Sequence, residues 1–260
     1  MRKPGLFLVL AGGLAVALAG SACEAPRQER SRSSSPGSAA FDGEPSAPYQ
    51  AEAEEGVGAA VAILIDTSGS MKDAAPGDSR PKYLVAREAL EAVLDTTEAV
   101  AAKRSGFPIK IGIYSFSSSA TRLLPIRPYD RAAVNTVLSR LPAPGGGTAI
   151  GDAMREARPD LYRAGVFRKY ILVVTDGENT TGRSPADVAA DIFRKSEGGV
   201  QIHFVAFDTS PEKFAFLTSV GGSVLGAANG ADLRSALDQI YQGKILAEAV
   251  DAGETAPIKK

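Results

Sequence analysis

The 260-residue chain contains one cysteine, one histidine and no tryptophan. With only Cys23 available, an internal disulfide is excluded, and the region beyond residue 56 has no cysteine nucleophile. The single histidine, His203, lies in the apolar segment QIHFVAF, where we expect a hydrogen-bonded or sheet-edge residue and not a catalyst. The usual nucleophile and base pairs of hydrolases and transferases are therefore missing, and we expect that the protein is not an enzyme.

The chain also has no large excess of charge of either sign. The chain carries 29 basic and 30 acidic side chains with no block of like charge, so nucleic acid is not an expected partner. The glycine-rich segment PGGGTAIG lacks the lysine that a phosphate-binding loop places after its second glycine. These absences argue against nucleic acid as a partner and against a phosphate-binding loop of the G-x-x-x-x-G-K-[ST] type.

The N-terminus has the three parts of a secretory signal. MRKPG is basic, LFLVLAGGLAVALAG is apolar, and small residues follow up to SAC. The apolar stretch Leu6–Leu18 is shorter than the roughly 20 residues that cross a bilayer, so a retained transmembrane anchor is the alternative and export is the expectation. We predict a signal peptide over residues 1–22.

The sole cysteine falls where this signal ends. The segment AGSAC resembles the lipobox of bacterial lipoproteins, although Gly20 stands where that motif usually has leucine. The resemblance implies that Cys23 is lipidated and becomes the first mature residue, in a protein anchored to a membrane of the bacterial cell envelope. The alternative is ordinary cleavage after Ala19 or Ala22, which would leave a soluble periplasmic or secreted protein.

Composition then divides the remaining chain. Residues 23–56 are rich in Ser, Pro, Ala and charge with little to bury, which predicts a disordered tether. Residues 57–245 carry regular apolar patterns and form the expected globular domain, and residues 246–260 read as a polar tail. A flexible tether of this length has a root-mean-square reach of about 30 Å.

Strand and helix patterns alternate through the domain. Continuous apolar runs are typical of central parallel strands with both faces covered, and they alternate with segments of helical period. We therefore predict a three-layer α/β fold of the Rossmann-like type, with a mostly parallel, doubly wound sheet and helices on both faces. Pro125 places the segment ATRLLPI at a sheet edge, and Pro159 is expected to kink or end the helix that begins at Ile150. The expected main strands are 57–66, 109–118, 169–176 and 200–208, and the expected helices are 82–104, 130–141, 150–158, 184–199 and 231–242.

Three loops of this fold carry oxygen-bearing side chains. DTSGS and TDGEN follow apolar strands, and GGGTAIGDAM precedes a helix, where Gly147 is expected to allow a tight backbone. In parallel sheets such loops meet at the carboxyl edge. Carboxylate and hydroxyl oxygens without nitrogen or sulfur suit Mg²⁺, with Mn²⁺ or Ca²⁺ as substitutes, and suit Zn²⁺ poorly. The candidate metal ligands are Asp66, Ser68, Ser70, Thr148 and Asp176.

These three motifs, in this order, resemble the von Willebrand factor type A (vWA) domain. In that family the D-x-S-x-S motif, a threonine and a second aspartate form the metal-ion-dependent adhesion site (MIDAS). The resemblance covers about Val57 to Tyr241. It implies that Ser68, Ser70 and Thr148 bind Mg²⁺ directly, and that Asp66 and Asp176 bind it directly or through water. An Asp or Glu of a protein partner would complete the shell, which makes the chain a binding module.

Other interpretations of these five residues stay open. Each ligand has an ordinary role available, since Ser68 and Ser70 could cap turns, Thr148 could cap its helix, and the two aspartates could form Asx-turns. The domain would then be a scaffold, or one whose metal only pins its loops. A Mg²⁺-dependent phosphohydrolase also starts from a strand ending in Asp, but it resembles D-x-D-x-[TV], and Ser68 stands where the second Asp is required.

Overall fold

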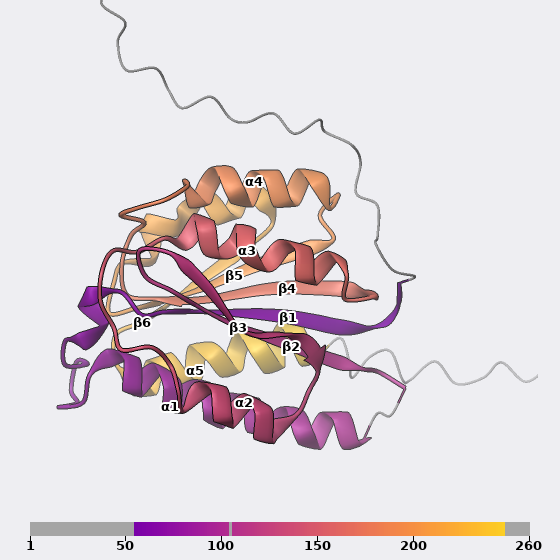
Figure 1. Cartoon of the computed structure of the whole chain (residues 1–260), viewed down its shortest axis with the longest axis horizontal. Helices are drawn as coiled ribbons and strands as arrows, with labels where there is room; N and C mark the ends of the chain where they lie inside the picture. The colour runs from indigo at the N-terminus through magenta and orange to yellow at the C-terminus, as the bar shows by residue number, and fades with distance from the viewer. Residues whose placement is uncertain (1–54, 104–105, 248–260) are drawn as a thin grey trace, which may run out of the picture. The chain divides into compact units, whose positions relative to one another are not determined.

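The computed structural model describes residues 55–103 and 106–247, which all belong to one compact unit, Pro45–Lys260. At its centre lies a six-stranded sheet with the order β3-β2-β1-β4-β5-β6 (Figure 1). All neighbouring strands are parallel except β2 and β3, which are antiparallel. The strands are β1 (Gly56–Asp66), β2 (Ile109–Phe116), β3 (Ala120–Pro128), β4 (Val166–Thr175), β5 (Val200–Phe207) and β6 (Ser223–Ala227).

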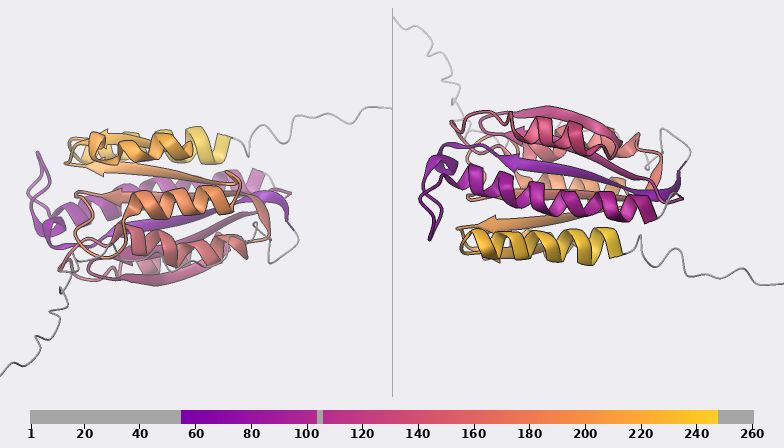
Figure 2. Two further views of the ribbon diagram at one scale, coloured as in Figure 1. Left: turned by 90° about the horizontal axis from the view of Figure 1, so that it is seen from above. Right: turned by 90° about the horizontal axis from the view of Figure 1, so that it is seen from below.

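Helices cover both faces of the sheet. Figures 1 and 2 show α3 and α4 on one face and α1, α2 and α5 on the other, and each group encloses its own apolar core. The predicted three-layer, mostly parallel α/β fold is thereby confirmed. The helices are α1 (Lys82–Lys103), α2 (Arg131–Leu138), α3 (Ile150–Tyr162), α4 (Pro185–Lys195) and α5 (Gly230–Ile240), with the short helices η1 (Gly69–Lys72), η2 (Pro211–Val220) and η3 (Tyr241–Leu246).

Strand β1 explains why its sequence is apolar without alternation. Successive side chains of a strand point to opposite faces, so a strand covered on both faces needs apolar residues at every position. The core beside α1 and α5 receives Val61, Ile63 and Ile65, and the core beside α3 receives Ala60, Ala62 and Leu64. Burial continues to Asp66, which is 0% exposed. The run of aliphatic residues thus delivers a carboxylate to the end of a fully buried strand.

The register of the sheet places the polar loops together. Asp66 pairs with Phe116 at the end of β2, and Ile65 pairs with Val174 near the end of β4. Because these strands are parallel, their carboxyl ends lie at one edge, where a ligand site of an open α/β sheet is expected. The segments that follow Asp66 and Thr175 therefore leave the sheet side by side.

Prolines confirm one local prediction and exclude one of the two outcomes predicted for another. Pro125 lies in β3, which is the edge strand as predicted and extends to Pro128. Pro159 does not end its helix, because α3 continues to Tyr162. A proline removes one backbone donor, so the carbonyl of Arg155, four residues earlier, loses its helical partner. The Pro159 carbonyl still accepts a hydrogen bond from the Arg163 N–H at 3.1 Å.

Several predictions concern residues outside the described ranges. The signal peptide 1–22, Cys23 and nearly all of the tether 23–56 fall there, and so does most of the tail 246–260. The division of the chain into these segments and a domain over 57–245 stays a prediction. Within residues 55–103 and 106–247, no helix is both long enough and apolar enough to cross a membrane.

Candidate metal centre

The loop after β1 and the end of β4 bring four of the five predicted ligands into contact. The Ser70 hydroxyl donates a hydrogen bond to Asp176 Oδ1 at 2.8 Å, although the two residues are 106 positions apart. The Ser68 and Ser70 hydroxyl oxygens lie 3.3 Å apart. The Ser68 N–H donates to Asp66 Oδ1 at 2.7 Å. Oxygen atoms from β1, η1 and β4 thus gather at the carboxyl edge of the sheet.

Asp66 is the most buried of these groups. Its second oxygen, Oδ2, accepts a hydrogen bond from the Thr175 hydroxyl at 2.6 Å. Burial raises the Asp66 pKa to about 6, against the lowering effect of the hydrogen bonds from Ser68 and Thr175, and the nearby charge of Asp176 adds to the rise. An ionised Asp66 is therefore destabilised in the metal-free fold, and a cation beside it would relieve that cost.

The hydrogen bond from the Ser68 N–H to Asp66 forms an Asx-turn, which is the alternative role that the sequence suggested for Asp66. Ser68 and Thr148, by contrast, do not cap helices with their side chains. Ser68 is the N-cap of η1 without a side-chain cap bond, and the N-cap of α3 is Ala149. The hydroxyls of Ser68 and Thr148 are therefore not consumed in helix capping.

The loop that carries Thr148 is bonded by its main chain to the loop after β1. The Gly69 N–H donates to the Gly146 carbonyl at 3.1 Å, and the Gly145 N–H donates to the Thr67 carbonyl at 2.8 Å, so the two loops are bonded to each other. The Thr148 N–H donates to the Thr180 hydroxyl at 2.8 Å. Within residues 55–103 and 106–247, the Thr148 hydroxyl forms no hydrogen bond to another side chain, which leaves its oxygen available.

Gly146 rather than Gly147 has the backbone conformation that demands glycine. Its φ is +80°, and a Cβ there would lie 2.5 Å from the Ser118 hydroxyl oxygen. Gly147 has ordinary φ but little space, since a Cβ would lie 3.0 Å from the Thr180 hydroxyl oxygen. The prediction of a tight glycine turn is right, and its centre is one residue earlier.

We expect Gly146→Ala to lower the free energy of unfolding by about 1–2 kcal/mol, because alanine is strained at positive φ and would displace Ser118. Gly145→Ala is the matched control, since its Cβ would meet only the Lys72 Nζ, at 3.8 Å. It should change stability by less than about 0.5 kcal/mol. Urea unfolding with chelator measures both. Equal losses in the two variants would show that the loop does not depend on the conformation of Gly146.

Sequence reasoning missed Lys82, the first residue of α1. Its Nζ lies 3.1 Å from Asp176 Oδ2 and 2.6 Å from Asp208 Oδ2, and its side chain is only 9% exposed. A signal was present, because a lysine at a helix N-terminus opposes the helix dipole and the first turn of α1 holds no acidic residue. A residue that breaks a local rule in this way is a candidate for a role in a site.

Three further residues make none of these contacts. Met71, which directly follows the D-x-S-x-S motif, is fully buried. Glu178 is a 63% exposed loop acid paired with Lys213 at 3.2 Å. His203 Nδ1 shares a hydrogen bond of 2.8 Å with the Ser223 hydroxyl, which confirms a hydrogen-bonded residue, and β5 has neighbours on both sides, so His203 is not at an edge. Burial, with a smaller effect of Lys244, lowers its pKa to about 4.

The donor set fits a hard divalent cation. In the described part of the chain no group of three or more His, Cys, Asp or Glu side chains could hold a metal, so a site here must also use hydroxyls. Two carboxylates and three hydroxyls at one edge provide such a set, and it resembles the oxygen environment that Mg²⁺ prefers. Asp66, Ser68, Ser70, Thr148 and Asp176 are the residues that would hold the ion, and this assignment stays a prediction.

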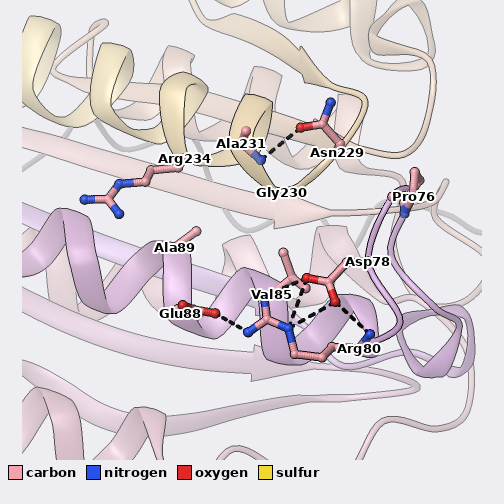
Figure 3. A pocket seen from close by; sticks show the side chains of 11 residues that line it. Pro76, Asp78, Arg80, Val85, Glu88, Ala89, Asn229, Gly230, Ala231 and Arg234 are labelled. Atoms are coloured by element: carbon pink, nitrogen blue, oxygen red, sulfur yellow. Dashed lines mark hydrogen bonds and ion pairs between the residues drawn. The ribbon is translucent and has the colours of Figure 1, made fainter.

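A separate pocket lies between the loop before α1 and the start of α5 (Figure 3). It has a volume of about 390 Å³, and none of the five predicted ligands lines it. Arg80, on its wall, is already neutralised by Asp78 at 2.6 Å and Glu88 at 2.5 Å. The pocket is therefore neither the predicted metal centre nor a site with an unpaired Arg80 for an anion.

A comparison with known protein families found a match over the region that holds the predicted ligands. Residues 61–178 match the model of the von Willebrand factor type A domain. All five predicted ligands lie inside this vWA match. A comparison with curated proteins found no match.

Several solved structures share the fold of this chain. A D319A mutant of the PilB minor pilin from Streptococcus sanguinis is 15% identical with a TM-score of 0.61, and the match covers 78% of this chain and 65% of the pilin. For BatB from Bacteroides thetaiotaomicron the values are 21% identity, TM-score 0.55, 72% of this chain and 98% of BatB. The chain spans less than two thirds of the pilin, and identities this low establish the fold alone.

One further match concerns a metal. Proximal thread matrix protein 1 from the mussel byssus, in a structure with a zinc-occupied MIDAS motif, is 20% identical with a TM-score of 0.55. The match covers 71% of this chain and 45% of the mussel protein. A divalent ion is thus held in the MIDAS of a protein that shares the vWA fold.

Proposed function

We propose that this protein is an exported, membrane-tethered binding module that recognises a protein partner through a Mg²⁺-dependent MIDAS. The observation that carries the proposal is the contact between the Ser70 hydroxyl and Asp176 Oδ1, beside the buried Asp66. It supports a site in which residues from two separate strand ends act together. vWA domains generally mediate protein–protein interaction, which agrees with a binding role.

The chemistry of the site favours an acidic partner. Asp66 and Asp176 bring two negative charges to a +2 ion, and hydroxyls add none, so a bound ion would keep affinity for an anionic oxygen. Such an oxygen comes from an Asp or Glu of the partner. Without the ion, Asp66 and Asp176 would repel that same carboxylate, so chelation should abolish recognition and not only weaken it.

The experiment that tests the proposal is affinity capture from bacterial envelope extract by the full-length protein. We expect one or more proteins to be retained with Mg²⁺ and released by chelator. The same capture with Thr148→Ala is the control, because this change removes one uncommitted hydroxyl and disturbs no side-chain hydrogen bond of the described residues. Equal retention with and without Mg²⁺ would contradict the proposal.

The scaffold and phosphohydrolase alternatives predict different results. A scaffold whose metal only pins its loops would bind Mg²⁺ and keep its partners in chelator. A phosphohydrolase would turn over phosphate esters with Mg²⁺ and lose that activity in Asp66→Ala. We propose that the protein is not an enzyme, since within the described residues no histidine or cysteine lies against Asp66 or Asp176 to serve as base or nucleophile.

The location of the protein is also part of the proposal. We infer that Cys23 is lipidated and holds the chain at a membrane of the bacterial cell envelope. Mass spectrometry of the mature N-terminus should find a chain that begins at a lipid-modified Cys23. A chain that begins at Gly20, or an unmodified Cys23, would favour the soluble periplasmic or secreted alternative.

A further inference from the structure

Lys82 joins the metal centre to a third carboxylate that the vWA motifs do not include. Its ammonium group lies between Asp176 Oδ2, at 3.1 Å, and Asp208 Oδ2, at 2.6 Å. Asp176 is fully buried at its side chain and uses its other oxygen, Oδ1, to accept the Ser70 hydroxyl. Asp176 therefore faces the predicted metal loops with one oxygen and Lys82 with the other.

We propose that Lys82 is a permanent internal cation of this centre, which shares Asp176 with the divalent ion and, balanced by Asp208, sets how tightly that ion binds. The inference rests on the proposed metal site and assigns two residues to it, Lys82 and Asp208, as positioning and affinity-setting residues. Neither is a predicted ligand.

The charges give the direction of each effect. Asp66 and Asp176 contribute −2, Lys82 brings the local sum to −1, and Asp208 returns it to −2. A divalent ion beside Asp176 is repelled by Lys82 and attracted by Asp208. At separations of several ångströms and an effective dielectric constant near 20, one unit charge changes the affinity for such an ion by about tenfold or more. Removing Lys82 and removing Asp208 should thus have opposite effects.

The backbone around the two residues is built for this contact. Asp208 has φ +51°, a left-handed backbone conformation. Residues other than glycine rarely adopt it, and among them Asp and Asn tolerate it best. The Asp208 N–H donates to the Ala227 carbonyl at 2.8 Å, which holds the turn. Lys82 likewise occupies a helix N-terminus that disfavours a cation. Two residues that oppose local preference meet each other, and strain of this kind is concentrated at functional sites.

Lys82 carries its positive charge at pH 8, where the titrations are made. Burial favours its neutral form, but the hydrogen bonds to Asp208 and Asp176 outweigh burial and raise its pKa above the ordinary value of 10.5. The competition between Lys82 and the metal ion is therefore one of fixed charges.

A purely structural role for Lys82 predicts the opposite sign. If the ammonium group only holds Asp176 in place, its removal would loosen Asp176 and weaken metal binding. If it acts as a competing cation, its removal tightens metal binding even though the metal-free fold loses a buried ion pair. The sign of the change in metal affinity separates the two roles.

The test is calorimetric titration of the full-length protein with Mg²⁺ at pH 8. Lys82→Met keeps an unbranched side chain one atom shorter and removes its charge, and we expect it to bind Mg²⁺ about tenfold more tightly. Asp208→Asn keeps the left-handed backbone accessible and should bind Mg²⁺ at least about threefold more weakly. Lys82→Arg preserves the charge and should stay within about threefold of the unchanged protein.

Lys103→Met is the matched control for net charge. Lys103 is the last residue of the same helix, 22 residues long, which places it roughly 30 Å from the site. Its replacement should leave the Mg²⁺ affinity unchanged. Urea unfolding in chelator verifies that each variant is folded, and Lys82→Met is expected to be the least stable because it leaves Asp176 buried without its cation.

The outcomes are distinguishable. A folded Lys82→Met variant with equal or weaker Mg²⁺ affinity overturns the inference, and so does an Asp208→Asn variant with equal or tighter affinity. If Lys82→Met does not fold, the result for Asp208→Asn decides. Absence of Mg²⁺ binding in the unchanged protein overturns the proposed function itself, whereas normal binding with no change in either variant overturns only the inference about Lys82.

Discussion

Asp66→Asn is expected to weaken Mg²⁺ binding by about 100-fold while the metal-free protein remains folded. The change removes half of the negative charge of the predicted ligands and keeps the shape of the side chain. An asparagine oxygen can still accept the Ser68 N–H. Its amide can donate to the Thr175 hydroxyl, which can then donate to the Gly177 carbonyl at 3.1 Å. The fold has no need of a charge at this position.

The measurement combines calorimetric Mg²⁺ titration with urea unfolding in chelator at pH 8. Asp66→Asn should be at least as stable as the unchanged protein without metal, because it removes a buried carboxylate whose ionised form is destabilised. Asp238→Asn, on α5, makes the same change in net charge away from the loops and should alter neither quantity. Undiminished Mg²⁺ affinity in Asp66→Asn would show that Asp66 is not part of the metal centre.

The second large effect concerns pH in the absence of metal. Asp66 has a folded pKa of about 6, above its ordinary value of 3.8, so its contribution to stability is present below pH 3.8 and is lost as pH rises to about 6. His203 has a folded pKa of about 4, below its ordinary value of 6.5, so its contribution is present above pH 6.5 and is lost as pH falls to about 4. Each change corresponds to about 3 kcal/mol.

Between pH 4 and 6 the two groups therefore act in opposite directions. The charged and polar neighbours that matter are Asp176 beside Asp66, and Lys244, Ser223 and the ring of Tyr170 around His203. In the unchanged protein the two contributions largely offset each other. Removing either group should reveal how the other makes the free energy of unfolding depend on pH.

Urea unfolding with chelator, from pH 4 to 7, measures these slopes. Relative to the unchanged protein, Asp66→Asn should gain stability as pH rises, by about 3 kcal/mol over the window, and His203→Gln should lose stability as pH rises. Groups common to all three proteins cancel in these differences. Parallel stability curves for the three proteins would mean that neither buried group titrates as the structure indicates.

The sequence predicted the fold and the meeting of the loops because both depend on local patterns. A continuous apolar run ending in Asp66 identifies a buried parallel strand, and the register of parallel strands brings its end beside the end of β4. The relation between Asp66, Ser70 and Asp176 follows from that topology. The assignment of these residues as metal ligands is a prediction that metal titration will test.

What the sequence did not predict depends on distance in space. Lys82 and Asp176 are 94 positions apart, and the ion pair with Asp208 joins a helix start to a third strand end. No period or motif links such residues. The end of α3 was uncertain for a different reason: Pro159 was expected to kink or end the helix, and it does not end it, because α3 continues to Tyr162. Thr175, which holds Asp66, was overlooked because it reads as one more strand residue.

The direction of β1 decides at which end of the sheet the predicted metal loops lie. This 11-residue strand begins at Gly56 and ends at Asp66, which separates its two ends by roughly 33 Å. The chain enters at one end of the sheet and presents Asp66, Ser68 and Ser70 at the opposite end. The point where the preceding chain joins β1 and the predicted metal loops therefore lie at opposite ends of the same strand, so the predicted ligands are remote from the place where the chain enters the sheet.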